Sequence, residues 1–191
     1  MDQIQSDGPV SEEILADLIQ RAQCNSDPEA FEGLYLCFAD RVYRYLLVRL
    51  GDVEAAEEIT SQVFVRLIEK IDTFTIAHKD NVAIFSAWLY RLARNMMVDV
   101  LRAEKRYRRA ATEYTRHVEH NKTLSVNDRL ALEDVMRKLR CLNDQQQEVI
   151  ICRFIEELSI AETARIMRKT EAAVKALQQR ALENLRRLGT V

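Results

Sequence analysis

Apolar residues recur at every third or fourth position along most of the chain, which is the spacing that places them on one face of an α-helix. A first stripe begins after Ser11, a suitable N-cap, and runs to about Asn25. A second begins with Asp27 as N-cap and Pro28 at the first helical position, and it ends at Gly51. The pattern therefore predicts two consecutive helices at the start of the chain.

Two longer helices are predicted next, separated by a loop over residues 72–81, where the helical period is lost. The first spans about Val53 to Ile71, and the residues expected to face inward are Ala56, Ile59, Val63, Phe64, Leu67 and Ile68. The second runs from about Ile84 to Arg109, and its apolar face consists of Trp88, Leu89, Leu92, Met96 and Val100.

The periodicity weakens over residues 110–127, which are polar and are expected to form a flexible linker. Four shorter helical signals follow, at about residues 128–141, 144–157, 160–167 and 171–188. The third begins with Ser159 and Glu162 in the S-x-x-E pattern of a capping box, and Thr170 can cap the fourth. Two short helices joined by so tight a turn have the spacing of a helix-turn-helix.

Composition agrees with an all-α fold. The chain has 4 Gly and 2 Pro among 191 residues, and neither type occurs between Asp52 and Leu188. With 48% hydrophobic residues, the chain can form real cores. We therefore expect two small helical domains, residues 1–109 and 128–191, joined by the linker.

Several classes of protein are disfavoured. No apolar run approaches the roughly 20 residues of a membrane span, and the acidic N-terminus does not resemble a signal peptide, so a cytoplasmic protein is expected. The widely spaced cysteines are expected to be small buried side chains, namely Cys24, Cys37, Cys141 and Cys152.

Enzymatic chemistry is also disfavoured. Glu57 and Glu58 are adjacent, so on a helix they project in different directions and do not form an acid and base pair. His117 and His120 flank Glu119 within the linker, but this spacing without a further ligand is weak support for a metal site. We expect no catalytic residues, no metal and no cofactor.

Charge is segregated along the chain, although the net charge is only -2. Residues 88–109 and 163–191 each contain seven Lys or Arg against two Asp or Glu. Separate basic blocks of equal strength favour two contacts with one polyanion, and the alternative is two solvated helix faces. In the first block the cations alternate with Trp88, Tyr90 and Tyr107, which favours single-stranded DNA; Trp88 could equally belong to the core.

The last predicted helix has an outer face suited to a DNA major groove. Lys175, Gln178 and Arg180 can reach base edges or phosphates, and Arg168 and Lys169 in the preceding turn can contact the backbone. The alternative is an ordinary helical hairpin with a polar exterior, because such a pattern in one sequence has many false positives.

Four motifs in order carry a family resemblance. They are AFEGLYLCFADRVYRYL (30–46), AEEITSQVFVRL (56–67), FSAWLYRLARNMMVDVLR (85–102) and the C-terminal helix-turn-helix. The chain resembles a bacterial sigma-70 family factor over about Leu18 to Leu188. With two helical domains and a linker, it is similar to the extracytoplasmic-function (ECF) group, the promoter-recognition subunits of RNA polymerase.

The resemblance implies that residues 1–109 are region 2-like and bind the clamp of core RNA polymerase. The residues implied in this contact are Glu57, Glu58, Thr60, Gln62 and Arg66. It also implies that the same domain reads and opens the minus-10 element of promoter DNA. The residues implied there are Trp88, Arg91, Arg94, Asn95, Arg102 and Lys105.

Residues 128–191 are implied to be region 4-like, to bind the minus-35 element as a duplex and to meet the polymerase flap. The implied DNA-binding residues are Arg168, Lys169, Thr170, Glu171, Lys175, Gln178, Gln179 and Arg180. The sequence departs from the family pattern at two places: Arg168 stands where glycine is usual, and Ala172-Ala173 stand where Gly-Thr is common. The geometry of the turn and the identity of the minus-35 bases therefore do not follow from the resemblance.

The resemblance further implies an anti-sigma factor as a partner. The sequence leaves two other functions open. One is a helix-turn-helix regulator that binds duplex DNA as a dimer without polymerase. The other is a helical adaptor that sequesters a protein partner, for which neither basic block contacts DNA.

Overall fold

The structure is a computed structural model, and it describes residues 11–75, 81–110 and 135–188. Throughout these ranges the regular secondary structure is helical, so the all-α prediction is confirmed. No helix in the described ranges is long and apolar enough to cross a membrane. The predicted linker lies outside the described residues except for Ala110, which ends a helix.

The N-terminal half contains helices with the predicted caps. They are α1 (Glu12–Asn25), α2 (Pro28–Leu50), α3 (Val53–Lys70), the short 3-10 helix η1 (Ile71–Thr73) and α4 (Asn81–Ala110). The side chain of Ser11 accepts a hydrogen bond from the amide of Ile14, and Asp27 caps α2 through the amide of Glu29. Gly51 ends α2 in the left-handed conformation, with φ 69°, which glycine adopts without steric cost.

The C-terminal half contains a helical stretch at residues 135–140, α6 (Asp144–Ile150), α7 (Ile160–Met167) and α8 (Glu171–Leu188). The predicted helix over residues 144–157 is not regular. After α6 the chain continues as a π-helix, η2 (Ile151–Ile155), in which the amide of Glu156 bonds to the carbonyl of Ile151. Glu157 then takes a positive φ of 52°, which ends the helix.

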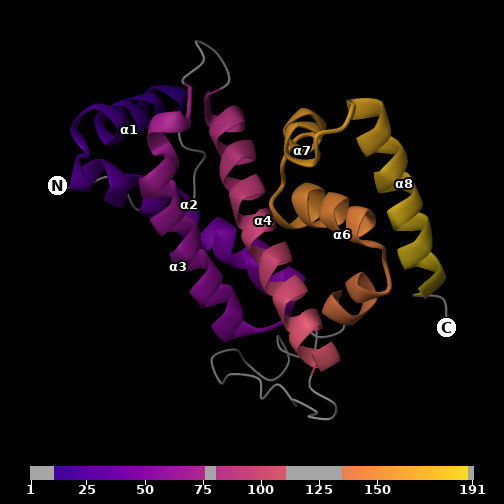
Figure 1. Ribbon diagram of the computed structural model, residues 1–191. Helices are drawn as coiled ribbons and strands as arrows, with labels where there is room; N and C mark the ends of the chain where they lie inside the picture. Colours follow the sequence, from indigo (N-terminus) through magenta and orange to yellow (C-terminus); the bar gives the residue numbers. More distant parts are fainter. Residues whose placement is uncertain (1–10, 76–80, 111–134, 189–191) are drawn as a thin grey trace, which may run out of the picture.

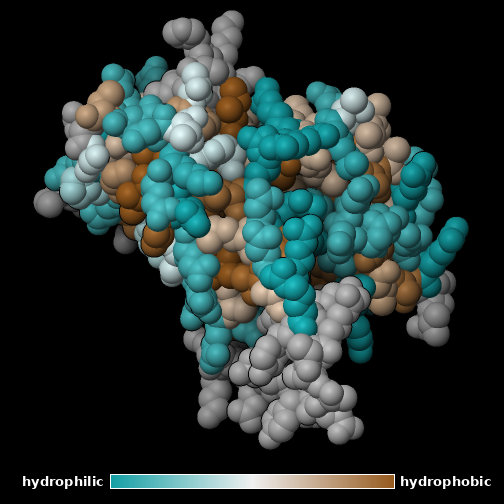
Figure 2. Space-filling view, in the orientation of Figure 1, coloured by the Kyte–Doolittle hydropathy of each residue, from teal (hydrophilic) through white to brown (hydrophobic). Residues whose placement is uncertain are grey.

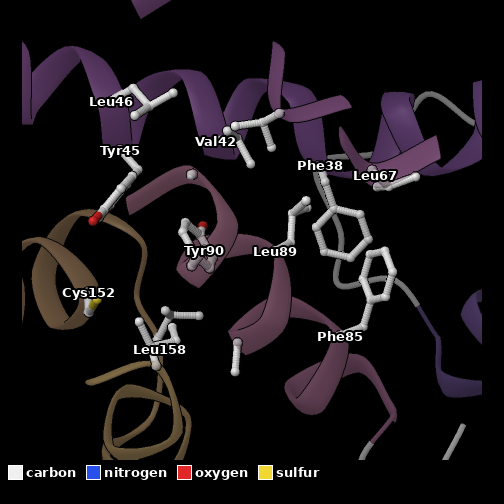
Figure 3. Packing of buried hydrophobic residues seen from close by; sticks show 14 of the residues in the cluster. Phe38, Val42, Tyr45, Leu46, Leu67, Phe85, Leu89, Tyr90, Cys152 and Leu158 are labelled. Atoms are coloured by element: carbon white, nitrogen blue, oxygen red, sulfur yellow. The ribbon is translucent and has the colours of Figure 1, made fainter. Parts of the chain in front are cut away.

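Helix α4 lies between the two halves (Figure 1). On one side it packs against α1, α2 and α3, and on the other it packs against α7. The η2 segment contacts α2 in addition. One cluster of buried hydrophobic residues therefore extends from α1 to α8, and Figure 3 shows Tyr45 and Tyr90 beside Cys152 and Leu158.

Several predicted core positions are wrong. Ile68 is 53% exposed, because α3 packs its inner side against α2 and α4 and leaves this position outside. Cys24 and Cys141 are exposed and Cys37 is only half-buried, so among the cysteines the prediction of burial holds for Cys152 alone.

Candidate polymerase and nucleic-acid interfaces

Helix α3 presents a polar face to solvent. Glu57, Glu58, Gln62 and Arg66 are all exposed, because the apolar residues of α3 are turned toward α2 and α4. The side chain of Gln62 donates to the carboxylate of Glu58 at 3.0 Å, one turn earlier on the helix. The structure therefore brings together four of the five residues implied in polymerase binding.

Thr60 does not belong to this face. Its side chain is 7% exposed, and its hydroxyl donates to the carbonyl of Ala56 at 2.7 Å within α3. A buried hydroxyl that already has a partner is not available to another protein. The structure therefore does not bring Thr60 together with the other four residues, because the position that the family resemblance supplied falls on the inner side of the helix.

Apolar side chains that were not predicted to be exposed lie on the outer side of the same helix. Val65 and Ile68 are both exposed, and the exposed ring of Tyr35 in α2 packs edge-on against Phe64, 4.8 Å between centroids. Contiguous exposed apolar residues mark contact surfaces. The signal that could have found them is a helix with apolar residues on more than one face.

Helix α4 carries the residues implied in minus-10 binding. Figure 2 shows hydrophilic side chains down the middle of the visible face, along α4. Asn95 and Arg102 are exposed, and Arg102 pairs with Asp99 at 3.6 Å. The side chain of Lys105 is outside the described part of the chain.

The aromatic residues of α4 are less available to bases than the sequence suggested. Trp88 is half-buried, with ring centroids 5.6 Å from both Phe74 and Phe85. Tyr90 is 1% exposed, so its interpretation as a stacking residue for DNA was wrong. Tyr90 lies on the side of α4 that meets the C-terminal half. The side chain of Tyr107 is not described.

The helix-turn-helix has the predicted caps. Ser159 and Glu162 form a complete capping box at the start of α7, and the hydroxyl of Thr170 accepts from the amide of Ala173 at 3.2 Å. Arg168 takes the left-handed conformation, with φ 53° and ψ 49°, and the amide of Lys169 bonds back to the carbonyl of Ala164. The turn therefore keeps the geometry that glycine would adopt, at a modest steric cost.

Helix α8 leaves most of the implied minus-35 residues on its surface. Arg168, Thr170, Glu171, Lys175, Gln179 and Arg180 are exposed, and Lys169 is half-buried. Gln178 differs, because it is half-buried and accepts a hydrogen bond from Arg153 of η2 at 3.2 Å. The side chain of Gln178 is thus engaged within the protein.

The sequence did not indicate that two carboxylates of the C-terminal half are buried against the N-terminal half. The hydroxyl of Tyr45 in α2 donates to Glu148 in α6 at 2.9 Å, and the hydroxyl of Tyr90 in α4 donates to Glu156 at 2.6 Å. Burial raises the pKa of both carboxyl groups. Burial also raises the pKa of each tyrosine well above its usual value. No local pattern could have found a contact between such distant positions.

Arginines of the N-terminal half surround these carboxylates. Arg41 and Arg44 of α2 approach Glu156 at 3.6 and 3.7 Å, and Arg94 of α4 approaches Glu148 at 3.6 Å. Arg49 completes the contact with a 3.0 Å hydrogen bond to the side chain of Gln147. An implied minus-10 residue, Arg94, is therefore paired with the other half of the chain.

In the described ranges no group of His, Cys, Asp and Glu is arranged to hold a metal ion. His117, Glu119 and His120, the weak metal candidate, lie outside those ranges.

Comparisons with known proteins agree with the sequence resemblance. The model of sigma-70 region 2 matches residues 34–107, and that of sigma-70 region 4 matches residues 138–187. The ECF RNA polymerase sigma factor BldN of Streptomyces coelicolor is 39% identical over 178 residues, which cover 91% of this chain and 65% of BldN. SigW of Bacillus subtilis, another ECF sigma factor, is 31% identical over 84% of this chain and 89% of SigW.

Solved structures share the fold. CnrH, in complex with the cytosolic domain of CnrY, is similar with a TM-score of 0.66 and 24% identity, over 92% of this chain and 94% of that one. The sigma factor RpoE, in complex with the anti-sigma factor NepR from Bartonella quintana, also has a TM-score of 0.66, with 19% identity over 85% and 98% of the chains.

Proposed function

Because the chain belongs to the extracytoplasmic-function group of the sigma-70 family of RNA polymerase sigma factors, we propose that its two halves divide promoter recognition between them. Residues 1–109 bind core polymerase and the opened minus-10 element. Residues 128–191 bind the minus-35 duplex and the polymerase flap, and residues 110–127 link them. RNA synthesis is the chemistry of the polymerase, and this chain supplies binding and orientation in the cytoplasm, where the bacterial chromosome lies.

Polymerase binding is assigned to the polar face of α3, defined by Glu57, Glu58, Gln62 and Arg66. Within the described ranges, Gln62 bonds to Glu58 and Arg66 pairs with Glu69, so these contacts lie along α3 itself and do not hold it against another helix. The neighbouring apolar residues Val65 and Ile68 extend the contact. A polar rim beside apolar side chains is the usual anatomy of a protein interface.

Minus-10 recognition is assigned to α4. Arg91, Arg94 and Arg102 supply charge for the DNA backbone, and Asn95 supplies an amide for base edges. Trp88 retains a partly exposed ring that an unstacked base can contact. Removing one base from the stack at this helix would nucleate strand opening.

The observation that carries the proposal is the helix-turn-helix of α7 and α8 with its outer face free. Lys175, Gln179 and Arg180 project from α8 into solvent, as a recognition helix in a major groove requires. Arg168 and Thr170 in the exposed turn lie where DNA phosphates pass. We also propose an anti-sigma factor as a partner; RpoE, which shares this fold, has been solved in complex with the anti-sigma factor NepR.

The decisive test combines recruitment, recognition and opening. The purified protein is added to sigma-free bacterial core polymerase, fragmented DNA of the source genome is transcribed, and the RNA 5′ ends are mapped. We expect discrete starts that share two upstream motifs. No starts from a polymerase proven active, together with a footprint of the protein alone on duplex DNA, would instead identify a polymerase-independent regulator.

Variants then separate the two DNA contacts. Lys175→Ala should weaken discrimination at the minus-35 motif by about 1–3 kcal/mol if it reads a base, with minus-10 preference unchanged. Asn95→Ala should weaken the minus-10 motif and strand opening and leave the minus-35 motif unchanged. Equal losses at both motifs from either variant would refute this division.

A further inference from the structure

Helix α1 has no role in the proposed function, yet its last turn is tied to the short helix η1. The side-chain amide nitrogen of Gln23, which is half-buried, donates to the carbonyl of Ile71 at 2.7 Å and to that of Phe74 at 2.6 Å. Ile71 begins η1, and Phe74 is the residue that follows it. The contact uses both N–H bonds of the amide group. Gln23 therefore fixes the backbone at both ends of η1.

The ring of Phe74 belongs to a group of aromatic side chains that includes Trp88. Phe74 is buried, and its ring centroid lies 5.3 Å from that of Phe85 and 5.6 Å from that of Trp88. Phe85 and Trp88 stand one turn apart on α4, and Phe85 packs in addition on Phe38 of α2 (Figure 3). Aromatic rings at these separations attract each other in particular orientations. The orientation of Trp88 therefore depends on where Phe74 is held.

The other end of α1 is tied to the start of α4. The two carboxylate oxygens of Glu12 accept from the amide of Val82, the second residue of α4, at 3.2 and 3.1 Å. Amides in the first turn of a helix have no partner within the helix and carry the positive end of its dipole. A carboxylate at this place satisfies such an amide and stabilises the helix start. Glu12 thus fixes the turn of α4 that precedes Phe85 and Trp88.

Trp88 needs this support because its own packing leaves it half-buried. A side chain that is partly in solvent changes rotamer readily. A ligand that binds such a side chain must first order it, and that cost weakens binding. A ring that is already held by fixed neighbours does not carry the cost. The two ties of α1 hold the two elements, η1 and α4, between which the indole ring packs.

We propose that α1 positions Trp88 for the minus-10 element, and that Gln23 and Glu12 are its positioning residues. Gln23 holds Phe74, Glu12 holds the first turn of α4, and the indole ring is kept ready to receive an unstacked base. Neither residue touches DNA, because each acts through Trp88. The inference rests on the proposed function, since it requires that Trp88 contact the opened minus-10 strand.

Two variants remove the ties without changing α4, and each has a matched control. Gln23→Met keeps a long unbranched side chain and deletes the donors, and Gln20→Met makes the same change at an exposed position of the same helix. Glu12→Ala deletes the carboxylate beside α4. Glu13→Ala removes an equal charge from the same exposed first turn of α1.

Trp88 is the single tryptophan of the chain, so the fluorescence of the free full-length protein reports on this ring alone. For each protein we would measure the quenching of this fluorescence by acrylamide and the free energy of unfolding in urea. With core polymerase added, we would measure affinity for a single-stranded oligonucleotide that carries the mapped minus-10 motif. Affinity for a minus-35 duplex serves as the second DNA measurement.

We expect Gln23→Met to weaken single-strand binding about five- to tenfold, as the loss of its hydrogen bonds predicts. Glu12→Ala should weaken it about two- to fivefold, the range for a charge at a helix terminus. In both variants acrylamide should reach Trp88 more easily, and minus-35 affinity should not change. Gln20→Met and Glu13→Ala should match the wild type in every measurement.

A purely structural role would give a different result. The variants would then lose free energy of unfolding, but in the folded protein the quenching of Trp88 and the affinity for the single strand would equal those of the wild type. That outcome would overturn the proposal. If Gln23→Met does not fold, Glu12→Ala decides by the same measurements, because it changes only an exposed side chain.

The proposed function is judged on the wild type in the same experiment. Wild-type protein that does not bind the single strand with core polymerase would refute the proposed function and, with it, the use of Trp88 for DNA. Wild-type protein that binds the strand, beside variants with unchanged quenching and binding, would refute only the positioning role of α1. Greater quenching together with weaker single-strand binding in the variants would support both.

Discussion

Arg91 of α4 and Arg168, in the turn between α7 and α8, are close enough to interact although they stand far apart in the sequence. Burial lowers the pKa of Arg91, and the charge of Arg168 lowers it further. Two cations assigned to different promoter elements thus carry like charges where α7 packs against α4.

Reversing the charge of Arg168 should therefore strengthen the packing of the two halves against each other. Arg168→Glu converts the repulsion of Arg91 into attraction, and we expect the equilibrium to shift about two- to fivefold toward the packed arrangement, the range of a solvent-exposed ion pair. Sedimentation at low and high salt measures the change, which should shrink as salt screens the charges. Lys169→Glu is the control with the same change of charge at the next residue. An equal effect of both variants would show that the change comes from the net charge of the protein and not from the interaction between residues 91 and 168.

The left-handed conformation of Arg168 leads to a second prediction. Glycine adopts φ near 53° without the steric cost that Arg168 carries, so Arg168→Gly should raise the free energy of unfolding by about 1 kcal/mol. Arg168→Ala keeps that cost and loses the same charge, and it should leave stability nearly unchanged. Urea unfolding measures the free energy. Both variants should bind the minus-35 duplex more weakly if the guanidinium contacts phosphate.

The buried carboxylates predict a pH dependence of stability. The pKa of Glu148 is raised above its ordinary 4.5, chiefly by burial, against the lowering effect of Arg49, Tyr45 and Arg94 and with Asp144 raising it. A group whose pKa is higher in the folded protein stabilises it fully below the ordinary value, and this contribution is lost as pH rises through the folded value. The contribution of Glu148 to the free energy of unfolding should therefore fall as the pH rises above about 4.5.

Glu156 contributes with the same sign. Burial raises its pKa above 4.5, while the hydrogen bond from Tyr90 and the charges of Arg44 and Arg41 lower it. Each carboxyl adds a slope of at most about 1.4 kcal/mol per pH unit. Unfolding measured from pH 5 to 8 tests this, and Glu148→Gln with Glu156→Gln should flatten the curve. An unchanged slope in that variant would contradict the prediction.

The pH range of that experiment matters because Asp27 contributes to stability with the opposite pH dependence. The hydrogen bond from Arg21 lowers the pKa of Asp27 below its ordinary 3.8. Its contribution is present above that value and is lost as pH falls. Measurements at pH 5 and above therefore separate the buried glutamates from this surface pair.

The polar face of α3 predicts a loss of polymerase binding on charge reversal. Glu58→Lys places a cation in an exposed acidic surface, and we expect core polymerase affinity to fall about tenfold or more, that is, by about 1.4 kcal/mol. Glu13→Lys makes the same change on α1, away from this face, and should bind as the wild type. Titration with labelled core polymerase measures both. Equal affinities for the two variants would show that Glu58 does not contribute to polymerase binding.

Local chemistry explains how much of the fold was predictable. Asp27 with Pro28 starts a helix wherever that pair lies, and Ser159 with Glu162 caps α7 using only atoms within one turn. The exposed face of α8 also follows from helical spacing, as Lys175 and Arg180 demonstrate. These elements depend on neighbours along the chain, so the sequence by itself determined them.

The tertiary structure decided which buried polar residues meet. Nothing near Glu148 in the sequence indicates Tyr45, and helical spacing on α4 could not distinguish a Tyr90 that stacks on DNA from one that binds Glu156. The burial of Thr60 and the exposure of Ile68 likewise depend on where α2 and α4 pack against α3. Contacts between distant segments depend on the packing of whole helices, which no local pattern encodes. The sequence by itself therefore determined the helices of this protein, and only the tertiary structure decided how its two halves pack together.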